Sequence, residues 1–186
     1  MDADRPTPLP DQEWPEALED LRAGFAGKLN VYRVMAHHPA LLRAWAPLRA
    51  HIVTDSALGA ERSEVVILRT AHRFSSDYEW AHHVSRARKI GFSDQRIAAI
   101  AAMPKGEDAL ICRAVDALLD QHRLPPDLDR QLATLIGRHG VFDLMATVGF
   151  YSVLGYIPMS YNTPLDAEID REMAENPFAP NRSTEG

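Results

Sequence analysis

Residues 64–91, EVVILRTAHRFSSDYEWAHHVSRARKIG, decide the fold of this chain. The first half belongs to an apolar pattern with three- and four-residue steps that starts near Ala60, and it predicts a buried helix. The polar residues 75–77 interrupt this helix, and their side chains can accept the free amides of a new first turn. The second helix is expected to stop at Gly91, because glycine is typical just after a helix.

The same helical pattern recurs on both sides of this pair. Further helical runs are predicted at residues 16–25, 30–53, 94–103, 107–123, 128–140 and 141–157. Pro39 and Pro47 are expected to break the second run, and Ser93 to cap the third. Alternation typical of strands between hairpin turns is not found. The sequence therefore predicts an all-α fold of about eight helices.

The length of 186 residues fits one domain. Residues 1–14 contain three prolines, which disfavour a regular helix, and we expect an extended N-terminal arm there. Residues 15–174 are predicted to form a single helical domain, and residues 175–186 a C-terminal tail.

Composition and charge narrow the classes of partner. Hydrophobic residues make up 46% and charged residues 25%, and the formal net charge is −6. This acidic balance argues against nucleic acid and anionic membranes as partners, because both bind positively charged surfaces. The charge does not identify a substrate. The acidic, proline-rich start and the absence of about 18 consecutive apolar residues predict a cytoplasmic protein. Cys112 is the single cysteine, so a disulfide within one subunit is impossible.

The segment with the most chemistry is SSDYEWAHH, residues 75–83. On a helix, Ser76, Glu79 and His83 fall on one face, and Tyr78 and His82 fall on a neighbouring face. A carboxylate and an imidazole one turn apart can exchange a proton, which general acid–base catalysis requires. The same pair also fits an ion pair on a helix surface.

Other kinds of site have weaker support. The spacing of Glu79 and His82 is that of di-iron bundles, but a second Glu-x-x-His does not occur, and H-E-x-x-H is missing. Ser76 lies outside any G-x-S-x-G elbow, and the chain has no glycine-rich phosphate loop. Cys112 has an apolar, mid-helix context that suits a small core residue. We therefore predict neither a cofactor nor a metal.

Residues 64–91 resemble the carboxymuconolactone decarboxylase family, which is related to the alkyl hydroperoxidase D family. The family pattern is a glutamate, a step of twelve residues, a C-x-x-C-x-x-x-H block and a glycine soon after. In this chain Glu64 takes the glutamate position, Ser76 and Glu79 the two cysteine positions, and His83 the histidine position. A weaker resemblance extends over roughly residues 40–160.

The resemblance implies an alkyl hydroperoxidase D-like helical bundle and a decarboxylase branch that lacks the cysteine pair. Glu79 and His83 would transfer protons, and Glu64 would orient His83 or act as a neutral acid. Tyr78 or Ser76 could donate a hydrogen bond to a developing oxyanion. His82 and His139 are secondary candidates, His139 because it precedes the apolar residues 141–157.

The leading hypothesis is a cofactor-independent enzyme similar to carboxymuconolactone decarboxylase, a lyase of aromatic-compound catabolism that acts on a small carboxylated lactone. One alternative is a non-catalytic oligomer that binds a small molecule. Another is a peroxidase-related oxidoreductase that uses Cys112 between subunits or a bound metal. The resemblance also implies a homotrimer or homohexamer, to which residues 141–157 could contribute an interface.

Overall fold

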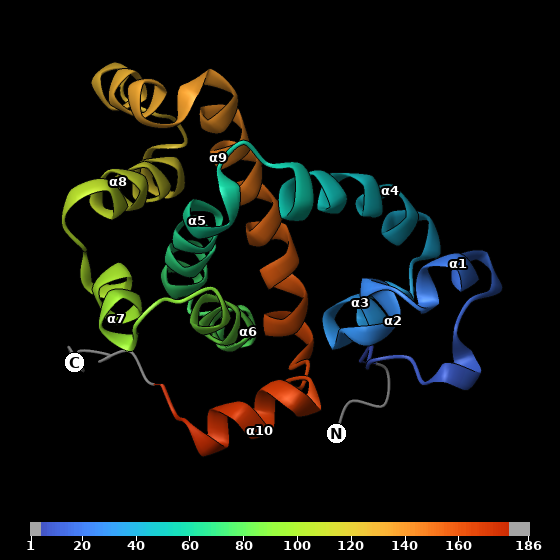
Figure 1. Ribbon diagram of the computed structural model, residues 1–186. Helices are drawn as coiled ribbons and strands as arrows, with labels where there is room; N and C mark the ends of the chain where they lie inside the picture. Colours follow the sequence, from blue (N-terminus) through green and yellow to red (C-terminus); the bar gives the residue numbers. More distant parts are fainter. Residues whose placement is uncertain (1–4, 179–186) are drawn as a thin grey trace.

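The computed structural model describes residues 5–178, and these form an all-helical fold (Figure 1). Their helices are η1 Asp11–Glu13, η2 Glu16–Leu18, α1 Glu19–Arg22, α2 Phe25–Lys28, α3 Asn30–Met35, α4 Pro39–Ala50, the π-helix η3 His51–Asp55, α5 Gly59–Phe74, α6 Asp77–Lys89, α7 Asp94–Ala102, α8 Gly106–Gln121, α9 Pro126–Tyr161 and α10 Ala167–Glu175. The fold is an alkyl hydroperoxidase D-like bundle, as the sequence predicts.

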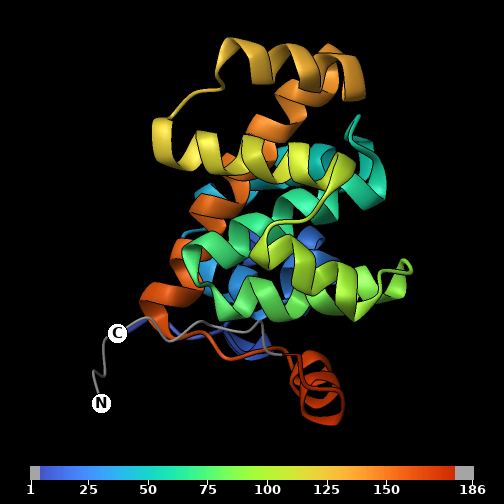
Figure 2. The same ribbon diagram turned by 90° about the vertical axis from the view of Figure 1, so that its left-hand side faces the viewer.

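Helix α5 lies at the centre of the bundle. It contacts α6, α7, α8 and α9, and residues 63–71 are buried all round the helix. Figure 1 shows α1–α4 on one side of the lower half of α9 and α5–α8 on the other. In the view of Figure 2, α10 lies below α6, the helix that it contacts.

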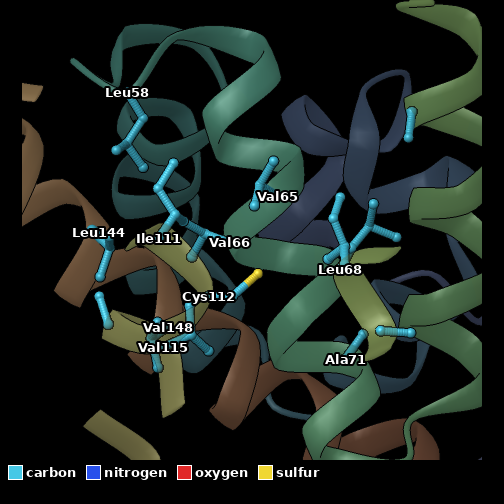
Figure 3. Close-up of a cluster of buried hydrophobic side chains, with 14 of the residues drawn as sticks. Leu58, Val65, Val66, Leu68, Ala71, Ile111, Cys112, Val115, Leu144 and Val148 are labelled. Atoms are coloured by element: carbon cyan, nitrogen blue, oxygen red, sulfur yellow. The ribbon is translucent and has the colours of Figure 1, made fainter. Parts of the chain in front are cut away.

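Two hydrophobic clusters share α5, α6 and α9. The first joins these helices to α7 and α8, and Figure 3 shows the sulfur of Cys112 within it, between Val66 and Leu68. The second joins them to α3, α4, η3 and the N-terminal segment, and Ile67 and Tyr78 belong to it. Some residues of α5 and α6 belong to the first cluster and others to the second. Polar side chains of these two helices can therefore lie at the boundary between the clusters.

The turn between α5 and α6 is tight. Ser75 is left-handed, with φ 54°, and its amide and that of Ser76 donate to the carbonyls of His72 and Ala71, both at 3.0 Å. These two bonds form a Schellman motif. Ser76 then occupies the N-cap position, but its side chain makes no capping hydrogen bond, in contrast to the sequence prediction. The backbone carbonyl of Ser76 instead accepts from Trp80.

Three helix boundaries differ from the sequence prediction. Pro47 does not break α4, which continues to Ala50 and then widens into η3. The runs 128–140 and 141–157 form one long helix with a kink at Gly137, where φ is 71° and ψ is 168°. Residues 16–25 are divided among η2, α1 and the start of α2. The described residues contain ten α-helices instead of about eight, because the runs 16–25 and 30–53 are each divided and α10 was not predicted, while two predicted runs are merged in α9.

The N-terminal segment packs on its own subunit. Leu9 and Trp14 are both buried in the second cluster, and the Trp14 indole N–H donates to the carbonyl of Leu18 at 3.0 Å. The predicted extended arm, residues 1–14, thus includes the helical turn η1 and two core residues. Residues 1–4 and the tail residues 179–186 lie outside the described part of the chain.

Helix α9 is long and apolar enough to cross a membrane by length and composition alone. Core helices of soluble proteins pass the same test, and half of the most apolar window of α9 is buried inside the fold. The kink at Gly137 also interrupts the helix.

A buried arginine ties three helices together. Arg69 of α5 donates to both carboxylate oxygens of Asp116 in α8, at 2.9 and 2.8 Å. It also donates to the carbonyls of Ile100 and Ala101 at the end of α7, at 3.0 and 2.6 Å. The Arg69 side chain is only 8% exposed, so these oxygen atoms receive their hydrogen bonds from Arg69 and not from water.

Arg69→Ala is expected to lower the free energy of unfolding by about 3–5 kcal/mol, because it leaves buried acceptors without their donor. Urea unfolding measures this loss. Arg62→Ala is the matched control from the same helix, since Arg62 pairs with Glu107 at the surface and is expected to contribute below about 1 kcal/mol. Equal losses in the two variants would contradict the assignment.

Candidate functional site

A cavity of about 270 Å³ lies beside α6. Its walls come from α3, α6, α9 and α10, the end of α4, and η3. Three tyrosines, Tyr32, Tyr78 and Tyr151, line it. The ionisable residues of its lining are Arg49, Glu79, His82, His83, Arg86 and Lys89. A small cavity with apolar walls and a few converging polar groups is the usual form of a small-molecule site.

The imidazole of His83 is held by Glu64. His83 Nδ1 lies 2.7 Å from Glu64 Oε2, and both side chains are buried. The other carboxylate oxygen of Glu64 forms an ion pair with Arg86, whose Nε lies 2.8 Å away. Because a carboxylate only accepts, the hydrogen lies on Nδ1 and leaves Nε2 of a neutral His83 as an acceptor. Glu64 itself lines a smaller neighbouring cavity of about 120 Å³.

Glu79 is a buried carboxyl group next to His83. Its Oε2 lies 3.9 Å from His83 Nε2, and its Oε1 has no hydrogen-bond partner in the described chain. Burial raises the pKa of Glu79, and this effect exceeds the opposing effect of His83 and His82. A carboxyl group that keeps its proton beside an imidazole can act as a general acid.

Tyr78 and His82 meet at Asp166, on the loop before α10. Tyr78 donates its hydroxyl hydrogen to Asp166 Oδ2 at 2.7 Å, and His82 Nε2 lies 2.6 Å from the same oxygen. Although burial alone raises the pKa of Asp166, hydrogen bonds from His82, Tyr78 and the Asn30 amide hold it below its ordinary value. The single hydroxyl hydrogen of Tyr78 is therefore committed to Asp166 in this arrangement.

Two of the predicted site residues lie elsewhere. Ser76 is buried at a larger cavity of about 650 Å³ on another face of α6, together with Trp80. His139 is exposed on α9 and does not line the cavity that contains His83. The structure thus brings Glu79, His83, His82 and Tyr78 to one cavity with Glu64 behind His83, and it separates Ser76 and His139 from them.

Several residues of the cavity were missed from the sequence. Arg86 had a local signal, since it lies three residues after His83 on the same helix face. Arg49 and Tyr32 come from α4 and α3, and Asp166 from the loop before α10. These three have no sequence spacing that links them to His83, because only the tertiary fold brings their segments together.

Cys112 lies apart from this cavity. Its side chain is fully buried in the first hydrophobic cluster, and burial raises the pKa of its thiol to about 12. A disulfide between subunits through Cys112 would require the core to open, so the structure lends no support to that part of the oxidoreductase alternative. Within residues 5–178, no group of three or more His, Cys, Asp or Glu side chains is arranged to hold a metal ion.

The sequence profile of the Carboxymuconolactone decarboxylase family matches residues 39–120, which include Glu64, Glu79 and His83. No curated protein sequence matches the chain.

Solved structures of similar fold include a cysteine-to-alanine variant of the debrominase Bmp8 in complex with 2,3,4-tribromopyrrole, with a TM-score of 0.71 and 16% identity. They also include an uncharacterized peroxidase-related protein from Silicibacter sp. TM1040, with a TM-score of 0.70 and 14% identity. Each match covers 91% of this chain and 96% of the other. At these identities the likeness establishes the fold alone.

Glu79→Gln is expected to become more stable relative to the wild type as pH rises from about 5 to about 8. The unfolded chain releases this proton near the ordinary pKa of 4.5, whereas burial raises the pKa in the folded protein. Between these two pKa values the folded state binds more protons, so wild-type stability falls by up to about 1.4 kcal/mol per pH unit. Glutamine has no proton to lose.

Thermal unfolding at several pH values measures the difference between the two proteins. Glu175→Gln, at an exposed position of α10, is the control and should follow the wild type. A stability difference between wild type and Glu79→Gln that stays constant with pH would show that Glu79 is ionised in the folded protein.

Proposed function

Because residues 39–120 belong to the carboxymuconolactone decarboxylase family, we propose that this chain is a cofactor-independent decarboxylase-like enzyme. Its substrate is a small carboxylated lactone or a related intermediate of aromatic-compound breakdown. The observation that carries the proposal is the position of the His83 imidazole. Its Nδ1 lies 2.7 Å from Glu64, and its Nε2 lies 3.9 Å from Glu79, whose pKa is raised by burial. This arrangement provides a base and an acid at the wall of one cavity.

Decarboxylation breaks the bond between a ring carbon and the carboxylate carbon and releases carbon dioxide. The electron pair moves toward the conjugated lactone carbonyl, and the ring carbon then needs a proton. Glu79 supplies that proton, because burial raises its pKa and favours its protonated form. After turnover His83 Nε2, 3.9 Å away, takes a proton from solvent water and passes it to the Glu79 carboxylate, which restores the acid.

The geometry lends no support to a thiol-dependent oxidoreductase. The two positions of the family's cysteine pair hold Ser76 and Glu79, which face different cavities. A binding-only protein would use the same cavity, but it has no need of a buried, protonated carboxyl group beside an oriented imidazole. The Glu64–His83–Glu79 arrangement therefore favours catalysis over binding alone.

His83→Ala is expected to lower carbon dioxide release by about 10²–10⁴-fold, the usual contribution of a general acid or base. The assay uses purified protein and a panel of carboxylated lactones and ring-cleavage acids. Glu79→Gln should show a similar loss, because its amide cannot deliver the proton. His139→Ala is the matched control, since that imidazole is exposed outside the cavity. Release that survives in both His83→Ala and Glu79→Gln would refute the proposal.

We also propose that the chain assembles as a homotrimer or homohexamer through α9. Phe142, Val153 and Tyr156 are 63%, 49% and 51% exposed, and their spacing places them on one helix face. Three large apolar side chains on one exposed face are typical of a surface that is covered in an assembly.

Val153→Asp with Tyr156→Asp is expected to reduce the assembly to smaller species, because two carboxylates would be buried without partners at the interface. Size-exclusion chromatography with light scattering measures the mass. Leu48→Asp, also at an exposed apolar position but on α4, is the control. An unchanged mass in the double variant would place the interface elsewhere.

A further inference from the structure

Arg49 is a cation of the cavity that lacks an ion-pair partner. It lies at the end of α4, two residues before the π-helix η3, and its side chain lines the same cavity as Glu79 and His83. Its Nε is buried and makes no hydrogen bond with any described residue. A buried N–H without an acceptor is unfavourable unless a ligand or water provides one.

The other two cations of the cavity are already paired. Arg86 forms an ion pair with Glu64, with Nε 2.8 Å from the carboxylate oxygen. Lys89 Nζ lies 3.6 Å from Glu168 and 3.5 Å from Glu172, both in α10. No carboxylate in residues 5–178 lies within ion-pair distance of Arg49, so among these three cations it is the one with a charge left for an anionic ligand.

The guanidinium of Arg49 is held in place by aromatic rings. Its central carbon lies 4.0 Å from the centre of the Phe25 ring and 5.7 Å from that of Tyr32. The two rings pack edge to face, with centres 4.8 Å apart. Stacking of this kind uses the flat face of the guanidinium and leaves the N–H groups at its edge for a planar acceptor such as a carboxylate.

Tyr32 connects Arg49 to the acid–base residues. Its hydroxyl lies within electrostatic reach of both Arg49 and Glu79, and burial keeps it protonated by raising its pKa. An anion bound at Arg49 would therefore share one cavity with Tyr32 and Glu79, since all three side chains line it. The raised pKa of Glu79 favours its neutral form, which does not repel an anion.

We propose that Arg49 is the carboxylate-binding residue of this cavity and selects planar organic anions over neutral molecules of the same shape. The inference rests on the proposed function only in taking this cavity as the substrate site. Arg49 acts by binding and orienting the substrate, whereas Glu79 and His83 transfer protons. In turnover its loss should therefore raise KM more than it lowers kcat.

The test measures binding without turnover. Isothermal titration calorimetry compares benzoate with benzamide, its neutral analogue of equal shape, on the purified full chain. Wild type is expected to bind benzoate about tenfold or more tightly than benzamide. Arg49→Gln should lose that preference through weaker benzoate binding, with benzamide binding unchanged. Arg49→Lys, which keeps the charge without the planar fork, should fall between the two.

Arg113→Gln is the control, because it removes one positive charge from an exposed position of α8, away from the cavity. Its benzoate affinity should equal that of the wild type. Equal affinity of wild type for benzoate and benzamide, or full benzoate affinity in both Arg49 variants, would overturn the proposal. These outcomes are independent of carbon dioxide release, so a failed decarboxylase assay with Arg49-dependent benzoate binding would refute only the proposed function.

Discussion

The hydrogen bond between Glu64 and His83 is the contact on which the site depends. A carboxylate that is 2% exposed is unfavourable unless it is paired, and His83 and Arg86 together satisfy both of its oxygens. The bond also joins α5 to α6, which are connected only by the two-residue turn at Ser75 and Ser76. The same interaction therefore fixes the packing of the central helix pair and the orientation of the imidazole.

The position of the cavity follows from the division of the core. Side chains on one face of α6 pack with α5, α7 and α8, while Tyr78 packs with α3 and the second half of α9. Glu79 and His83 lie between these faces, so they are buried without being enclosed by apolar groups alone. Burial raises the pKa of Glu79, and Arg49 is a cation of the cavity without an ion-pair partner among the described residues.

The members of the predicted acid–base group are close in the sequence, and the structure brings them together. Glu79 and His83 are one turn apart on one helix, and Glu64 comes from the helix before it. Ser76 was placed on the same face by the same spacing, but it lies at the other cavity. As an N-cap residue Ser76 has extended dihedral angles, φ −82° and ψ 95°, so a helical projection does not apply to it.

By itself, the sequence determined the all-helical class, the α5–turn–α6 pair and the residues that can exchange protons, because periodicity and spacing are properties of neighbouring residues. The tertiary structure alone decided which further groups face those residues. Arg49 and Tyr32 reach the cavity from α4 and α3, and Asp166, from beyond α9, contacts Tyr78 and His82 of its lining; no local pattern encodes such contacts. Protonation of Glu79 is likewise tertiary, since it depends on burial by helices that are distant in the sequence.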